Sequence, residues 1–361
     1  MLVLIVAALL SVGLLMVFSA SPTMAMSVGD SFYYLKKHLA SLLVGSFALY
    51  AGFKIDHGLL KNWSTYIISA TLFLLLIVFI PGAGIGLGGA RRWVYFGLFT
   101  FQPAEISKIA LIIFLAKELS SKTLARAMWP CLAATLTALL LILKEPDLGT
   151  AMIIAMIAFA LFFLAGTPIK HFAAVIVASL SGLLFISLTS AYRMKRLLAY
   201  LNPWSDPRGV GFHIIQSLIA VGSGGLFGVG LGGSKQKFFY LPQNYTDFIF
   251  AIFCEEMGLL GALSVLLLFF LFIVRGIRIA RSAPDAFSLL LSAGIVSWIG
   301  FQAILNMSVV VGMLPTTGIP LPFISYGGTS LIATLFGVGL LLNISQYRLI
   351  PRSPVREGEN I

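Results

Sequence analysis

The stretch FIFAIFCEEMGLLGALSVLLLFFLFIV, residues Phe248–Val274, decides the fold class of this chain. Its only charged residues are Glu255 and Glu256. A helix needs about 20 predominantly apolar residues to cross the hydrocarbon layer of a bilayer. The stretch therefore predicts a transmembrane helix that carries two carboxylates.

Nine further apolar runs predict helices of the same kind: Leu2–Phe18, Leu39–Phe53, Tyr66–Ile80, Pro103–Ala116, Met128–Leu143, Thr150–Ala165, Phe172–Leu188, Phe287–Val311 and Ser325–Ile344. The first run is longer than the apolar core of a signal peptide, so we expect a retained helix. The ten runs predict an all-α, polytopic membrane domain over residues 1–350. A long loop, residues 191–246, separates helices seven and eight, and residues 351–361 form a short charged tail that we expect to be disordered.

Composition supports a membrane protein and argues against several other classes. Of the 361 residues, 59% are hydrophobic and only 10% are charged, whereas soluble domains average about 25% charged residues. The two cysteines lie in apolar runs, and the four histidines show no zinc-ligand spacing. The net charge of +11 comes from basic residues in the loops, which indicates anionic lipid headgroups or an anionic substrate rather than nucleic acid.

The long loop combines basic residues with glycines. Its six basic residues are Arg193, Lys195, Arg196, Arg208, Lys235 and Lys237. They fit either contact with membrane lipids or capture of a diphosphate. Residues Tyr192–Leu198 predict an interfacial helix with a basic face. The segment Gly222–Gly233 holds seven glycines in twelve positions, which suits either close approach to phosphate oxygens or tight turns in a re-entrant loop.

Few acidic residues lie near the predicted membrane boundary. Asp247 stands where the loop meets the eighth helix, as a helix cap or as a functional carboxylate. Glu105 and Lys108 are three residues apart, so they can form a structural ion pair or serve a substrate. Asp147 opens the sixth helix. Helical geometry places Glu255 on roughly the same side as Asp247, and the two adjacent glutamates need partners or protons.

Six motifs, in order along the chain, resemble those of one family of membrane proteins. They are Gly89–Trp93 (GARRW), Phe101–Lys108 (FQPAEISK), Glu145–Thr150 (EPDLGT), Gly211–Ser217 (GFHIIQS), Thr246–Ala251 (TDFIFA) and Pro320–Gly328 (PLPFISYGG). Together they resemble the SEDS family, the FtsW/RodA/SpoVE proteins. Residues Gln236–Pro242 and Gly312–Gly318 look more like the FtsW and SpoVE branches than the RodA branch.

The resemblance implies a topology and a chemistry. It implies ten helices in the bacterial cytoplasmic (inner) membrane, both termini in the cytoplasm, and an extracytoplasmic loop between helices seven and eight. It implies a peptidoglycan glycosyltransferase that polymerises lipid II, works with a class B penicillin-binding protein, and meets other membrane proteins of division or elongation. The family's essential loop aspartate corresponds to Asp247.

This reading yields a set of expected site residues. We expect Asp247 to act as general base, with inversion at the anomeric carbon, or to bind a divalent cation such as Mg²⁺ or Mn²⁺, with no organic cofactor. Expected substrate-binding residues are Arg92, Trp93, Lys108, Arg193, Arg196 and Lys237. Expected supporting residues are Glu105, Asp147, Gln216 and Glu255. The rival hypotheses are a lipid II flippase, which broken helices would suit, and a non-catalytic scaffold.

Overall fold

The computed structural model describes residues 1–26, 29–80, 84–87, 90–96, 99–168, 194, 200–238, 241 and 244–346. Nine of the ten predicted spans are helices in this part of the chain: α1 (Leu2–Ala20), α3 (Tyr33–Lys54), α4 (His57–Ile77), α5 (Pro103–Ser121), α6 (Leu124–Lys144), α7 (Leu148–Leu164), α11 (Ile249–Arg281), α12 (Ala286–Val310) and α13 (Gly328–Gln346). The expected seventh span, Phe172–Leu188, lies outside the described residues, as do the tail and the basic helix at 192–198 apart from Met194.

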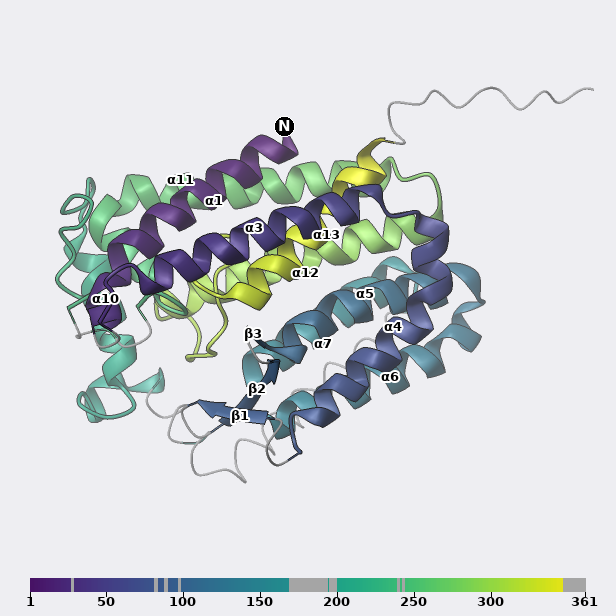
Figure 1. Ribbon diagram of the computed structural model, residues 1–361, viewed down its shortest axis with the longest axis horizontal. Helices are drawn as coiled ribbons and strands as arrows, with labels where there is room; N and C mark the ends of the chain where they lie inside the picture. The colour runs from purple at the N-terminus through teal and green to yellow at the C-terminus, as the bar shows by residue number, and fades with distance from the viewer. Residues whose placement is uncertain are drawn as a thin grey trace, which may run out of the picture.

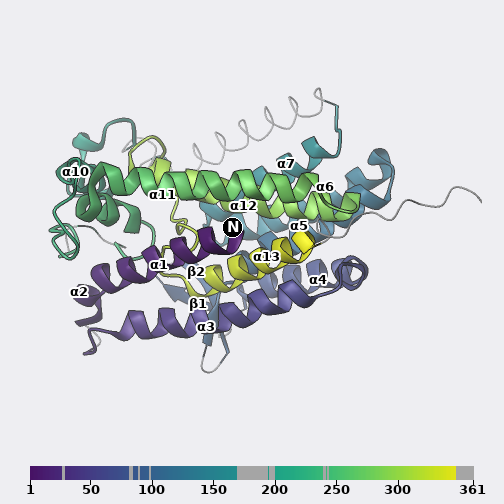
Figure 2. The same cartoon turned by 90° about the horizontal axis from the view of Figure 1, so that it is seen from above.

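The helices run side by side along the long axis of the molecule (Figure 1). In both views α3 lies along α13, and α11 lies beside α12 and α1 (Figure 2). Helices α4, α5, α6 and α7 form a second group, which joins the first where α5 and α7 pack on α12. The short helices α2 (Pro22–Ala25) and α10 (Phe212–Ser223) lie at one end of the bundle, which we call the loop end (Figure 2).

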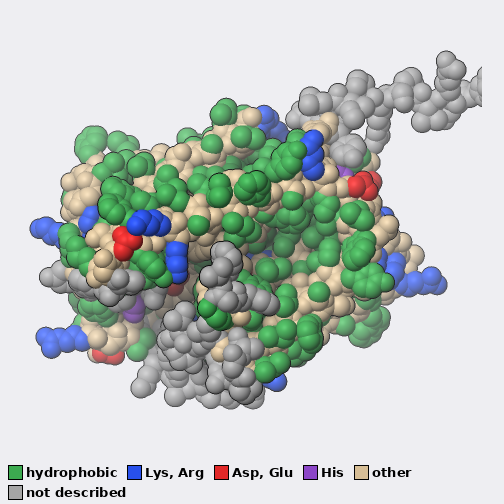
Figure 3. Space-filling view, viewed as in Figure 1, with side chains coloured by type: hydrophobic (Ala, Val, Ile, Leu, Met, Phe, Trp, Pro, Cys, Tyr) green, Lys and Arg blue, Asp and Glu red, His purple; other side chains and the backbone are tan. Residues whose placement is uncertain are grey.

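The surface is that of a protein solvated by lipid. Six described helices are long and apolar enough to cross a membrane. Large hydrophobic side chains on these helices, such as Phe73, Leu140 and Phe270, are exposed, and so is Phe47 on α3. In Figure 3 hydrophobic side chains cover most of the face between the two ends, and Lys and Arg lie mainly toward the ends. Apolar side chains in the middle suit contact with lipid tails, and basic side chains toward the ends suit contact with lipid headgroups.

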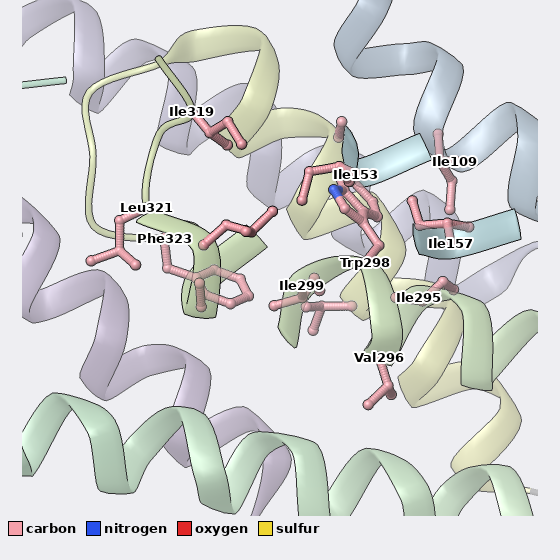
Figure 4. Close-up of a cluster of buried hydrophobic side chains, with 14 of the residues drawn as sticks. Ile109, Ile153, Ile157, Ile295, Val296, Trp298, Ile299, Ile319, Leu321 and Phe323 are labelled. Atoms are coloured by element: carbon pink, nitrogen blue, oxygen red, sulfur yellow. The ribbon is translucent and has the colours of Figure 1, made fainter. Parts of the chain in front are cut away.

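A hydrophobic core joins the two helix groups near the middle of the bundle (Figure 4). Trp298 of α12 is fully buried, and Ile109 of α5 and Ile157 of α7 lie beside it on one side. Phe323 and Ile319, from the segment that connects α12 to α13, close the cluster on the other side. The connecting segment is therefore part of the core, although it is not helical.

A small antiparallel sheet between α4 and α5 was not predicted from the sequence. Strand β1 (Gly84–Leu87) pairs with β2 (Ala90–Phe96), and β2 pairs with β3 (Phe99–Phe101). It lies beside the loop end of α5 (Figure 1). Both Arg92 and Trp93 belong to β2, so the sheet fixes the position of two expected substrate-binding residues.

Helix α11 is broken near its loop end, where Gly258 has φ 66° and ψ −167°. Around the break the helix bonds with the glycine-rich loop instead of with itself. Val229 and Gly230 donate to the carbonyls of Glu255 and Glu256 (both 3.0 Å). In return, the N–H groups of the two residues after Gly258 donate to the carbonyls of Gly225 and Leu226 (2.9 and 3.2 Å). Four backbone groups of α11 at the break are thus paired within the chain, which is what a helix break inside a membrane would need.

The glycines of this loop allow that close approach. A Cβ at Gly228 would lie 2.1 Å from the Glu256 carbonyl oxygen, and one at Gly224 would lie 2.0 Å from that of Cys254. Gly228 also has a positive φ of 80°. Of the two interpretations of Gly222–Gly233, the structure therefore favours tight turns over a phosphate cradle.

Candidate active site at the loop end of the bundle

Asp247 lies in a backbone segment that two other elements hold in place. Its carbonyl accepts a hydrogen bond from Asn306 Nδ2 of α12 (2.7 Å). The carbonyl of Thr246 accepts from Ser325 Oγ (2.6 Å), and that of Tyr245 accepts from the N–H of Tyr326 (3.0 Å). Three consecutive carbonyls therefore have partners far away in sequence, which fixes the path of the chain at Asp247.

The Asp247 side chain is half-buried beside the segment that connects α12 to α13. A Cβ at Gly318 would lie 3.6 Å from Asp247 Oδ2, and the φ of Gly318 is 75°. Helix α11 begins at Ile249 with Phe248 at its N-cap. Phe248 rather than Asp247 therefore occupies the N-cap position, and Asp247 directly precedes it near the positive end of the helix.

Aromatic rings surround this segment. The ring centroid of Tyr245 lies 4.6 Å from that of Tyr34 and 5.6 Å from that of Tyr326. Burial raises the pKa of Tyr326 to about 12 and also raises the pKa of Tyr245. Both phenols therefore stay neutral at physiological pH and keep their O–H donors.

Helix α10 covers the start of α11 from the loop side. The ring of His213 stacks on Phe248, with centroids 5.8 Å apart and planes at 18°. Ser217 donates to the carbonyl of Val310 at the end of α12 (2.7 Å). Gln216, an expected supporting residue, lies half-buried on the same helix.

Arg92 and Asp147 meet at the turn between α6 and α7. Arg92 is half-buried, and its guanidinium donates to the carbonyls of Glu145 (Nε, 3.0 Å) and Pro146. Asp147 caps α7 by accepting from the N–H and the hydroxyl of Thr150 (3.0 and 2.9 Å). A third donor reaches Asp147 from the Nε2 of Gln102, which directly precedes α5 (3.1 Å).

This turn also lies against the segment that faces Asp247. A Cβ at Gly149 would lie 2.7 Å from the carbonyl oxygen of Thr317, the residue before Gly318. The structure thus brings the start of α7 and the neighbourhood of Asp247 to one region of the loop end. Trp93 is half-buried on β2, next to Arg92 in the chain.

Glu145 is a residue whose importance the sequence analysis missed. Its side chain is 1% exposed, and neither carboxylate oxygen has a hydrogen-bond partner. Burial raises its pKa to about 8, the charge of Asp147 adds to the rise, and Arg92 opposes it. The only signal in the sequence was its place in the motif at 145–150, because the burial of a single side chain cannot be predicted from sequence.

Glu105 and Lys108 form the structural ion pair that their spacing allowed. The distance from Lys108 Nζ to Glu105 Oε1 is 2.7 Å, and the two side chains are 0% and 3% exposed. Lys108 also donates to Gln302 Oε1 (2.9 Å), whose Nε2 donates to the carbonyl of Pro320 (2.9 Å). The pair therefore supports the segment that faces Asp247. The Lys108 ammonium is buried in this structure, and substrate binding by Lys108 stays a prediction.

Lys237 is likewise turned inward. Its Nζ lies 3.0 Å from Glu256 Oε1, with side-chain exposures of 7% and 0%. Glu255 accepts from the N–H groups of Lys235 (2.9 Å) and Gln236 (3.4 Å) and from the hydroxyl of Ser234. These contacts supply the partners of Glu255 and Glu256 that the sequence did not reveal. Arg193 and Arg196 lie outside the described residues, so their roles stay predictions.

Asn306 is another site residue that the sequence analysis did not name. It is 2% exposed, and its Nδ2 donates to the carbonyls of both Asp247 and Ile319 (2.7 Å each). A signal was available, because an amide side chain inside an apolar span usually has a specific partner.

Whether this protein could hold the expected divalent cation depends on the oxygen, nitrogen and sulfur ligands that its side chains offer. In the described ranges no group of three His, Cys, Asp or Glu side chains could hold a metal ion. Mg²⁺, however, is often held by one or two carboxylates together with substrate phosphates. The half-buried carboxylate of Asp247 fits that second arrangement, with the diphosphate of a substrate supplying the other oxygens.

The fold and the site define a class: an integral membrane protein built on a bundle of apolar helices, in which the carboxylate of Asp247 lies where a long loop meets helix α11. The chain belongs to the FtsW/RodA/SpoVE family, whose model, described as "Cell cycle protein", matches residues 1–349. The resemblance inferred from the motifs is thus confirmed.

Individual relatives agree with that membership. The chain is 46% identical over 353 residues to stage V sporulation protein E of Bacillus subtilis, which covers 96% of each chain. It is 43% identical over 344 residues to the probable peptidoglycan glycosyltransferase FtsW of Geobacter metallireducens, covering 94% of this chain and 92% of that protein.

Solved structures give the same result. The chain resembles Thermus thermophilus RodA with a TM-score of 0.71 and 30% identity, over 96% of each chain. It resembles a chain from a structure described as a peptidoglycan synthase complex that coordinates polymerization and crosslinking, with a TM-score of 0.80 and 32% identity. That match covers 96% of this chain and 97% of the other.

Proposed function

We propose that this protein is a peptidoglycan glycosyltransferase that polymerises lipid II into glycan strands at the outer face of the bacterial cytoplasmic membrane. The observation that carries the proposal is the fixed position of Asp247. Its backbone is held from α12, and the two residues before it are held from the segment preceding α13. A carboxylate fixed at the membrane boundary suits a reaction between two lipid-anchored sugars.

In the proposed reaction Asp247 acts as general base. The 4-hydroxyl of the acceptor GlcNAc on lipid II attacks the anomeric carbon of the undecaprenyl-diphosphate-linked donor chain. The new C–O bond forms as the bond from carbon to diphosphate breaks, and the hydroxyl proton passes to Asp247. One displacement inverts the anomeric centre, which converts an α-linked donor to a β-1,4 linkage.

The departing diphosphate needs charge stabilisation more than it needs a proton. We propose that Arg92 supplies part of this stabilisation, because its side chain lies at the loop end and is half-exposed. Arg193 and Arg196 complete the proposed set of cations. In a variant of the proposal, Asp247 would hold a divalent cation, which would supply charge stabilisation for the diphosphate. A metal-bound Asp247 would leave proton removal to another base.

The proposed topology places both termini in the cytoplasm and the loop end outside. The name of the Geobacter relative supports the activity, and the description of the solved synthase complex supports assembly with a partner that crosslinks strands. We propose a class B penicillin-binding protein as that partner. Other membrane proteins of division or elongation, and anionic lipids, are the further proposed contacts.

The rival flippase hypothesis depends on broken helices that line a polar path. The break in α11 is filled by the protein's own loop. The pocket beside it, of about 330 Å³, is lined mainly by apolar or small residues: Val221, Gly222, Gly225, Leu226, Cys254, Gly258, Leu259 and Ala262. Such a lining does not suit the passage of a diphosphate and a sugar at this break.

One assay separates the three hypotheses. Purified protein, free of other synthases, is supplied with lipid II, and glycan strands are resolved on a gel. An enzyme makes strands. A flippase makes none and instead moves labelled lipid II between leaflets of a vesicle, and a scaffold does neither.

A further inference from the structure

A buried cluster joins α1, α11 and the long loop at the loop end. Glu256 is fully buried, and its two carboxylate oxygens accept from Ser19 Oγ at 2.7 and 2.8 Å. Lys237 Nζ donates to Glu256 Oε1 (3.0 Å), to Ser19 Oγ (3.2 Å) and to the carbonyl of Gly232 (2.7 Å). We call Ser19, Lys237 and Glu256 the clasp.

The clasp connects to the segment that carries Asp247. The carbonyl of Lys237 accepts from Asn244 Nδ2 (3.0 Å) and from Thr23 Oγ1 (2.9 Å). Asn244 is fully buried and stands three residues before Asp247. A displacement of Lys237 would therefore be transmitted, through one side-chain hydrogen bond, to the residues that precede Asp247.

Stability alone is a poor reason for such a cluster. Replacing a buried ion pair by packed apolar side chains is often neutral or stabilising, because desolvation of the charges offsets their attraction. What the pair does provide is a fixed geometry. Lys237 cannot leave Glu256 without leaving two buried charges unpaired, and Glu255 fixes the same loop through the backbone of Lys235 and Gln236.

We propose that Glu256 and Lys237 are positioning residues for glycosyl transfer: the clasp fixes residues 234–238 on α11 and, through the hydrogen bond from Asn244 to the carbonyl of Lys237, holds Asp247 in its reacting position. The inference rests on the proposed function and adds a role for three residues that do not touch the substrate. It replaces the expectation that Lys237 binds the substrate directly.

The test compares four variants in the full-length protein together with its class B penicillin-binding protein. Glu256→Gln and Lys237→Met each break the clasp, the double variant removes both charges, and Ser19→Ala is a milder change should a charge variant fail to fold. Glu118→Gln is the matched control. Like Glu256, Glu118 is a buried carboxylate (3% exposed) that forms ion pairs with lysines, Lys117 and Lys122, but it lies at the end of α5 that is far from the loop end. The measurements are kcat and KM for lipid II, thermal unfolding, and amide hydrogen exchange.

A misplacement of about 1 Å typically costs about 10²-fold in rate. We therefore expect Glu256→Gln and Lys237→Met to lower kcat by about 10- to 100-fold, with KM changed far less. Exchange should quicken within residues 234–247, and the double variant should lose no more than the worse single one, since either change already opens the clasp. Ser19→Ala should show the same pattern more weakly, and Glu118→Gln should leave kcat unchanged.

The proposal is overturned if the clasp variants keep the wild-type kcat. It is also overturned if the activity of these variants falls only as much as the amount of folded protein falls, and amide exchange within residues 234–247 is no faster than in the wild type. A rise in KM alone for Lys237→Met would return Lys237 to the substrate-binding set. Should the wild type make no strands, the proposed function fails, while the exchange comparison still reports whether the clasp orders the loop.

Discussion

Asn306 of α12 binds the backbone at Asp247 and at Ile319 with the same side-chain amide, through two hydrogen bonds of 2.7 Å. One buried residue thus ties the start of α11 to the segment that connects α12 and α13. The candidate active site is assembled at this junction, between stretches of chain that are distant in sequence.

This relationship predicts the effect of Asn306→Leu. The substitution removes both hydrogen bonds, and a buried carbonyl that loses its donor costs about 1–3 kcal/mol. We expect a lower Tm and, in the protein that remains folded, a kcat for glycan synthesis reduced by about tenfold or more because Asp247 loses its support.

Asn343→Leu is the control for that variant. Asn343 Nδ2 also donates to two carbonyls, those of Phe53 (2.6 Å) and Ile55 (2.9 Å), and the residue is 9% exposed near the opposite end of the bundle. We expect a similar loss of Tm with an unchanged kcat. Equal losses of kcat in the two variants would show that Asn306 acts only through stability.

Glu145 predicts how stability depends on pH. Because its folded-state pKa is raised from 4.5 to about 8, the folded protein holds this proton over a range where the unfolded chain has released it. Its contribution to stability is complete below about pH 4.5 and is lost as pH rises toward about 8.

The matching variant is Glu145→Gln, which keeps the size of the side chain and cannot ionise. We expect the fall in Tm between about pH 5 and about pH 9 to be smaller in Glu145→Gln than in the wild type. Thermal unfolding of the purified protein across that range checks this. Parallel curves for the two proteins would mean that Glu145 is not protonated in the folded state.

Comparison of sequence and structure shows which features were predictable. The helices were predictable because membrane solvation demands long apolar runs, and each run is a local property of the chain. The break in α11 was not, because it depends on hydrogen bonds between Gly258's neighbours and a distant loop.

The same distinction applies to the site. The motifs gave Asp247 and Arg92 as candidates. That Lys237 turns inward could not be predicted, because it depends on Glu256 and Ser19, which only the fold brings close. A basic residue in a loop looks the same in sequence whether it faces a substrate or a buried carboxylate.

Arg92→Ala and Arg193→Ala should weaken the use of lipid II more than they weaken membrane insertion. A charge-assisted contact to phosphate is typically worth about 1.5–3 kcal/mol, so we expect about a tenfold or larger loss in kcat/KM. Arg208, an exposed arginine of the long loop that also contains Arg193, provides the control Arg208→Ala. Unchanged kinetics in both test variants would make these residues lipid anchors.

The isolated protein should be a slow enzyme. The described part of the long loop rests on the bundle, yet exposes Phe227, Leu231 and Phe238. A loop that assembles the site only part of the time limits the rate. We expect the cognate class B penicillin-binding protein to raise the rate of strand synthesis in a titration. A rate that is independent of the partner would contradict this prediction.

The most direct test of the account is Asp247→Asn. The change preserves the size of the side chain, and α11 should still form because Phe248 occupies its N-cap. Asn cannot accept the hydroxyl proton or bind a metal as an anion, and loss of general-base catalysis typically costs about 10²–10⁴-fold. The measurement is the rate of glycan-strand synthesis from lipid II by equal amounts of purified wild-type and Asp247→Asn protein. The account predicts a loss of that order with lipid II and partner binding retained, and equal rates for the two proteins would contradict it.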